Sequence, residues 1–157
     1  MLHKIRVVLT GKTFEQNKKY KIYYHLKNRG YQNSKYLGLY KNKAVCAIGE
    51  IYSIVEADIH GDKVEVLEEE QGDVTEEMKR NIAIVTKEAR YKFGYELNKN
   101  HRFFFVKEYY DTEYKKRSKG GLMVTRYIDL EDVEDFRKEM AVSDIADLLK
   151  TKVWDVW

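Results

Sequence analysis

Short apolar and aromatic segments alternate with polar, glycine-containing stretches along most of the chain, and this pattern predicts a β-rich protein. The segments 36–40 and 44–54 flank the polar stretch Lys41-Asn42-Lys43, which has the length of a hairpin loop. A second hairpin is predicted at 55–67, with His60-Gly61-Asp62 as its turn. Further strands are expected at 4–10, 20–26, 102–110 and 122–128.

One segment has the periodicity of a helix. Between Thr75, a suitable N-cap, and Gly94, a typical helix stop, apolar residues recur at intervals of 4, 3, 4 and 4. These residues are Met78, Ile82, Val85, Ala89 and Phe93. The spacing predicts a helix over 75–93 that packs one apolar face against the sheet. Shorter helices are expected from Asp129 and from Ser143 onward.

Together these elements predict an α+β fold with a curved, mostly antiparallel sheet or a partly closed β-barrel, one central helix and short C-terminal helices. Gly38 and Gly49 lie inside predicted strands, where glycine favours sharp curvature or a bulge. We expect residues 1–130 to form the barrel domain and residues 131–157 to form a helical extension packed on it.

Composition narrows the classes of function. The 157 residues are 43% hydrophobic and 35% charged, which suits one domain with a charged surface. No apolar run approaches the roughly 18 to 20 residues of a membrane span, so we expect a cytoplasmic protein with no membrane partner. The single cysteine, Cys46, excludes an intramolecular disulfide and a cysteine-rich zinc site. The four histidines are far apart in the sequence, so no metal site and no cofactor are expected.

Charge is distributed unevenly. Residues 1–50 carry eleven basic and two acidic side chains, a balance of +9, whereas residues 51–100 carry seven and twelve, a balance of −5. A second basic segment follows at 101–126. If the two basic segments meet in space, they form a positive face of the kind that attracts a phosphate backbone; dispersed, solvated lysines would give the same count.

Base binding requires π surfaces for stacking, polar groups for base edges and cations for phosphates. The candidate base-binding residues are Tyr23, Tyr24, Tyr36, Tyr40, Tyr109, Arg126 and Tyr127. The candidate phosphate-binding residues lie in one basic loop: Lys115, Lys116, Arg117 and Lys119. Each tyrosine could equally be a sheet residue packed in the core, and the basic loop could equally be a solvent-exposed loop that binds no phosphate.

Two motifs resemble PUA-like β-barrels, the superfamily that includes the EVE, ASCH and YTH modules. The first is the hairpin from Lys35-Tyr36-Leu37-Gly38 to Ile48-Gly49-Glu50-Ile51, and the second is Gly120-Gly121-Leu122 through Asp129-Leu130 with its Arg126-Tyr127 pair. The resemblance implies a module that binds DNA or RNA, in which an aromatic pocket can hold a flipped or modified base, often in defence or restriction systems.

We therefore expect a nucleic-acid-binding module without catalysis of its own, acting beside a nuclease or NTPase partner. One alternative is a protein-interaction module that docks a partner through its C-terminal helices and the tryptophans of the tail, Trp154 and Trp157. Those tryptophans also suit an internal role that locks the tail onto the barrel. A further alternative is a metal-dependent ribonuclease, for which Asp58, Asp62, Glu65 and Glu68 would supply carboxylates.

Overall fold

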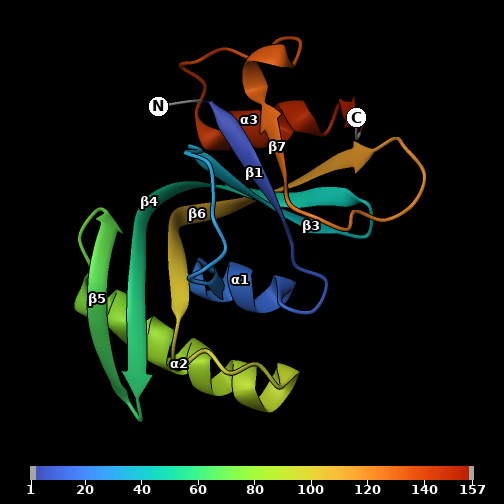
Figure 1. Ribbon diagram of the computed structural model, residues 1–157. Coiled ribbons are helices and arrows are strands. Elements are labelled where there is room, and N and C mark those ends of the chain that lie inside the picture. The colour runs from blue at the N-terminus through green and yellow to red at the C-terminus, as the bar shows by residue number, and fades with distance from the viewer. Residues whose placement is uncertain (1–2, 156–157) are drawn as a thin grey trace. The chain divides into compact units, whose positions relative to one another are not determined.

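The computed structural model describes residues 3–155 and combines one mixed sheet with three α-helices (Figure 1). In chain order the elements are β1 (Lys4–Leu9), α1 (Phe14–Tyr20), β2 (Ile22–Leu26), β3 (Tyr36–Lys41), β4 (Ala44–His60), β5 (Lys63–Gln71), α2 (Glu76–Phe93), β6 (His101–Lys116), β7 (Arg126–Asp129), a 3-10 turn (Leu130–Asp132), α3 (Val142–Leu149) and β8 (Val153–Trp154). Within residues 3–155, no helix is both long and apolar enough to cross a membrane.

The eight strands have the order β2-β6-β4-β3-β1-β7, with β5 paired to β4 and β8 paired to β6. Pairing is antiparallel for β1 with β7, β2 with β6, β3 with β4 and β4 with β5, and parallel for β1 with β3 and β6 with β8. The predicted α+β class is thus confirmed. The sheet is not closed, because the end strands β2 and β7 do not pair in the described part of the chain.

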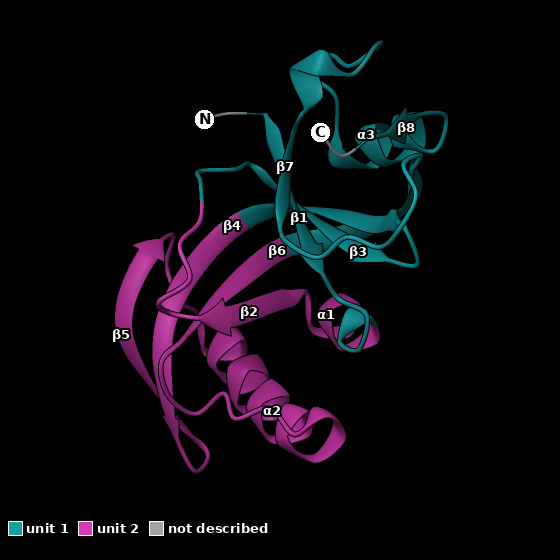
Figure 2. Cartoon of the chain, turned by 45° about the vertical axis from the view of Figure 1, so that its right-hand side comes forward, with its two compact units in different colours: residues 1–14, 32–51, 107–157 teal, residues 15–31, 52–106 magenta. Residues whose placement is uncertain are grey.

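The chain forms two compact units (Figure 2). Unit 1 comprises residues 1–14, 32–51 and 107–157, and unit 2 comprises residues 15–31 and 52–106. Strands β4 and β6 each contribute one part to either unit. The division expected after residue 130 does not coincide with a boundary of these units, since 107–157 lies wholly in unit 1.

The core of unit 1 joins β1, β3 and the start of β4 to α3 and the chain beyond β7. Gly38 allows close packing there, because a Cβ at this position would lie 2.8 Å from Cγ2 of Ile5 and 2.9 Å from Cγ1 of Val45. Trp154 is buried in the same core, and its indole N–H donates to the carbonyl oxygen of Tyr114 at 2.8 Å. The internal role expected of the tail tryptophans therefore holds for Trp154, whereas Trp157 lies outside the described residues.

The core of unit 2 forms between α2 and one face of β2, β4 and β6. Helix α2 begins and ends as its sequence predicts. The Thr75 hydroxyl accepts from the Met78 N–H at 3.1 Å, and Gly94 adopts the left-handed conformation with φ of 71°. Ile82 and three neighbours on the predicted apolar stripe are buried in this core.

Several elements differ from the prediction. Helix α1 forms in the polar stretch after Gly11, where no helix was expected, because Gln16 and Asn17 are buried by tertiary packing rather than by an apolar stripe. The helix predicted from Asp129 is only a 3-10 turn, since Val133 is extended and Asp135 has a φ of 72°. Strand β7 is also shorter than predicted, while β6 continues to Lys116.

Candidate nucleic-acid interface

Five of the six tyrosines that sequence analysis selected for base stacking lie inside the cores of the two units. These five are buried: Tyr23, Tyr24, Tyr36, Tyr40 and Tyr109. The Tyr24 hydroxyl donates to Oε1 of Gln16 at 2.6 Å, and burial raises the pKa of this phenol. Tyr40 accepts at its hydroxyl oxygen from the Leu122 N–H at 3.2 Å. These rings pack the cores and present no open face for a base.

Arg126 and Tyr127 lie half-buried on β7 in unit 1. The Tyr127 hydroxyl accepts a hydrogen bond of 2.9 Å from the backbone N–H of Gln32, which ties the segment before β3 to β7. The Nε of Arg126 is buried, and no group in residues 3–155 accepts its hydrogen. Tyr127 therefore has a structural contact, and both side chains are only partly open to a ligand.

The four cations predicted to lie in one basic loop are divided between the end of β6, which carries Lys115 and Lys116, and the loop after it, which carries Arg117 and Lys119. Two of the four hold the local conformation. The buried Lys116 Nζ donates to the carbonyl oxygens of Ser118 and Gly120, each at 2.7 Å. Arg117 forms an ion pair with Asp155 that lowers the pKa of this carboxyl below its usual value. Lys115, 3.0 Å from Glu113, and Lys119 remain on the surface.

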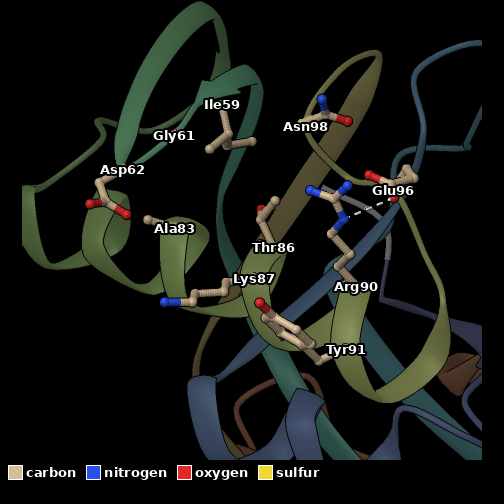
Figure 3. Close-up of a pocket in the computed structure, with 10 residues that line it drawn as sticks. All are labelled: Ile59, Gly61, Asp62, Ala83, Thr86, Lys87, Arg90, Tyr91, Glu96 and Asn98. Carbon is tan, nitrogen blue, oxygen red and sulfur yellow. Dashed lines mark ion pairs between the residues drawn. The ribbon is translucent and has the colours of Figure 1, made fainter.

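Unit 2 carries a hollowed surface that sequence analysis did not select. Two adjoining hollows, of about 650 and 610 Å³, lie between α2 and the turn that joins β4 to β5. They share Asp62 and Ala83, and together we call them the α2 groove; Figure 3 shows the first of the two hollows. The turn and the segment after α2 form its other wall, with Gly61 and Asn98 facing the helix.

The side chains along the groove follow from the helical repeat of α2. Because Met78, Ile82, Val85 and Ala89 face the core, residues half a turn away face solvent. That outward face carries Arg80, Ile84, Lys87 and Tyr91, again at intervals of 4, 3 and 4. The Tyr91 ring is 81% exposed, which is far more than any other large hydrophobic side chain on α2.

The groove has a positive charge balance. Its lining includes five cations, Lys63, Lys79, Arg80, Lys87 and Arg90, and three carboxylates, Asp62, Glu76 and Glu96. Two of the cations are engaged, since Lys79 lies 3.5 Å from Glu76 and Arg90 lies 3.2 Å from Glu96. Within residues 3–155, Lys63, Arg80 and Lys87 have no ion pair.

The hydroxyl of Thr86 adds a polar group to the floor of this groove. Its Oγ is buried and has no hydrogen-bond partner in the described part of the chain. The groove thus combines unpaired cations, an open aromatic ring and an unengaged polar atom within unit 2. Those are the components that recognition of a nucleic acid requires.

Comparison with known proteins adds no relative: no family model, no curated protein and no solved structure matches the chain. The groove residues were nevertheless accessible to sequence analysis. The stripe of Arg80, Ile84, Lys87 and Tyr91 is the counterpart of the apolar stripe that predicted α2. An exposed tyrosine between cations on the polar face of a helix is the signal that would have identified them.

Proposed function

We propose that this chain binds single-stranded nucleic acid through the α2 groove. The observation that carries the proposal is the outward face of α2, where Arg80 and Lys87 have no acidic partner among residues 3–155 and share that face with the open ring of Tyr91, one helical turn beyond Lys87. Cations without partners are available to phosphates, and a solvent-facing phenol ring is available to an unpaired base.

The spacing along the helix suits an extended strand. Ten residues separate Arg80 from Arg90, which at about 1.5 Å per residue is about 15 Å of helix. Over that length the groove offers three cations that face the same hollowed surface. Stacking of one base on an aromatic side chain contributes about 1–3 kcal/mol and tolerates any base, so this arrangement favours affinity over sequence selectivity.

We propose in addition that the chain is related to PUA-like modules. The β3–β4 hairpin supports it, because Gly38 lies at a crowded position where a side chain would meet two core residues. The buried tyrosines leave the groove, rather than a cage of strand residues, as the site that we assign to the bound strand.

The decisive experiment compares salt dependence between matched variants. Binding of a fluorescent single-stranded oligonucleotide is measured at several salt concentrations for the wild type, for R80Q/K87Q and for Y91A. If both cations contact phosphates, the slope of log K against log salt becomes shallower by about 1.4, since each contact to a single strand contributes about 0.7. Y91A is expected to weaken binding through lost stacking while the slope stays unchanged.

The control removes the same number of charges from the other basic surface. In K115Q/K119Q both substituted side chains are exposed loop or strand-end cations of unit 1. We expect this variant to keep the wild-type slope. A shallower slope in K115Q/K119Q together with an unchanged slope in R80Q/K87Q would assign the phosphates to the loop and reject the α2 groove.

A further inference from the structure

The hairpin of β4 and β5 has two faces with different chemistry. Val55, Ala57 and Ile59 of β4 pack in the core with α2. Because side chains alternate along a strand, Asp58 and His60 lie on the opposite face, away from α2. The α2 groove and this second face are therefore separate surfaces of the same hairpin.

On the second face, three side chains with metal-binding atoms converge. Asp58 of β4 pairs with Glu65 of β5 across the hairpin, and His60 lies two residues further along β4. One ligand atom from each residue lies within 4.8 Å of the other two. The closest pair is His60 Nε2 and Glu65 Oε1, at 3.0 Å. Oδ1 of Asp58 accepts from the Asn100 N–H at 3.3 Å, which orients this carboxylate.

The surroundings carry excess negative charge. Besides the carboxylates of Asp58 and Glu65, this face holds Glu56, which pairs across the hairpin with Glu68. In the described part of the chain these carboxylates are opposed by Lys27, 2.8 Å from Glu56, and by Lys63, which pairs with His60 across the hairpin. The hydrogen bond with Glu56 raises the pKa of Lys27, and Glu68 and Asp58 act in the same direction. The electrostatic environment thus favours a bound cation.

We infer that Asp58, His60 and Glu65 bind a divalent transition-metal ion, with Zn²⁺ as the ion that fits best. Zinc accepts imidazole nitrogen and carboxylate oxygen at about 2.0 to 2.2 Å, so its tetrahedral ligands lie about 3.4 Å apart. The His60 and Glu65 atoms lie 3.0 Å apart, close to that spacing, and all three ligand atoms lie within 4.8 Å of one another, so small side-chain rotations would bring them to it. Mg²⁺ and Ca²⁺ take oxygen ligands, so the imidazole discriminates against them.

This donor set leaves one position of a tetrahedral ion to water. Zinc sites with three protein ligands bind a water molecule as the fourth ligand and stay open to solvent, whereas structural zinc sites have four protein ligands. The inference does not depend on the α2 groove, because none of the three ligands lines it. The sequence analysis expected no metal site because the four histidines are far apart from one another, whereas strand pairing brings one histidine beside two carboxylates.

The test uses the full chain without a histidine tag. Zn²⁺ is titrated in competition with a chromophoric chelator, and Co²⁺ is added separately as a spectroscopic probe of coordination. We expect one Zn²⁺ per chain and d–d absorption from Co²⁺, with H60Q and E65Q each weakening Zn²⁺ binding at least about tenfold. The side chains of His60 and Glu65 are 55% and 58% exposed, so both variants are expected to fold, as circular dichroism will verify.

The matched control is E69Q, which removes the same charge from the same strand. Glu69 is exposed and pairs with Val55, whose side chain faces α2, so it lies on the other face of the hairpin. Wild-type Zn²⁺ affinity in E69Q, with loss in H60Q and E65Q, supports the site. Equal affinity of H60Q and wild type overturns it, as does an E69Q loss as large as that of E65Q.

Discussion

Arg102 holds the segment after β2 against the sheet of unit 2. Its Nε donates to Oε2 of Glu70 at 2.6 Å. One of its terminal nitrogens donates to the carbonyl oxygens of Lys27 and Arg29, at 3.0 and 3.1 Å. The guanidinium also lies 5.0 Å from the ring centroid of Tyr31. The Arg102 and Glu70 side chains are 13% and 16% exposed, so this ion pair is largely shielded from water.

Replacing Arg102 by methionine keeps the length of the side chain but removes the charge. Breaking a buried ion pair by removing one partner costs about 3–5 kcal/mol, because the other charge stays buried without its partner. Glu70 retains one donor, the Tyr31 hydroxyl at 2.9 Å, and water can reach the two loop carbonyls. We therefore expect the lower end of that range, a loss of about 3 kcal/mol in the free energy of unfolding.

Urea unfolding followed by tyrosine and tryptophan fluorescence measures this loss. Arg102→Met should lower the midpoint while the slope with urea stays the same. The double variant R102M/E70M removes both charges and should recover part of the lost stability, since apolar replacement of a whole buried pair is often neutral. Amide exchange in residues 27–31 should also accelerate in Arg102→Met, because this segment loses two hydrogen bonds.

A loss below about 1 kcal/mol would refute the reasoning, because exposed ion pairs contribute that little and the pair would then behave as solvated. Additive effects of R102M and E70M in the double variant would refute it as well. Two side chains that stabilise the fold through each other must show coupling.

Two further predictions concern packing and pH. Gly38→Ala should lower the free energy of unfolding by about 1–3 kcal/mol, because the new Cβ would lie 2.8 and 2.9 Å from two core side chains. The control is Gly11→Ala, whose new Cβ would meet nothing within 4 Å. Equal shifts of the unfolding temperature in the two variants would contradict this account. Burial lowers the pKa of His101 below its usual 6.5, so the unfolded chain binds its proton more readily and stability falls as the pH drops below about 6.5. Thermal unfolding between pH 5 and 8 should show a flatter pH dependence in His101→Gln than in the wild type, and identical profiles would argue against this role.

Elements with a strong local signal were predictable from the sequence. Helix α2 combines an apolar stripe with an N-cap and a C-cap residue. Each of the two hairpins turns at the polar segment that the sequence predicted as its loop. The first hairpin turns at Asn42 and Lys43, which both adopt positive φ as a two-residue turn of this hand requires. In these segments local preference and tertiary packing favour the same structure.

Elements that depend on distant partners were not predictable. Helix α1 lacks an apolar stripe, and its Gln16 hydrogen-bonds to Glu88, 72 residues away in the chain. The apolar spacing after Leu130 predicted a helix, yet Val133 and Phe136 reach the unit 1 core from irregular backbone. Periodicity shows which side chains are buried and leaves the backbone path between them undetermined.

The candidate site shows the same limit. Tyrosine-rich strands suggested an aromatic pocket, but Tyr36 is 1% exposed and serves the core. Sequence composition does not distinguish a packed phenol from an open one, since both occur on amphipathic strands. The predicted turn at His60-Gly61-Asp62 places His60 and Glu65 on facing strands, but the sequence alone does not show that their side-chain atoms approach to 3.0 Å.

The interleaving of the two units determines the order in which they can be completed during synthesis. All residues of unit 2 have been synthesised once the chain reaches residue 106, whereas unit 1 still lacks every residue from 107 onward. Strand β1 precedes β7 by more than 110 residues and must wait for it before its second neighbour exists. The edge of β1 that pairs with β7 therefore stays unpaired from the synthesis of β3 to that of β7, 85 residues later, and an unpaired strand edge of this kind promotes aggregation.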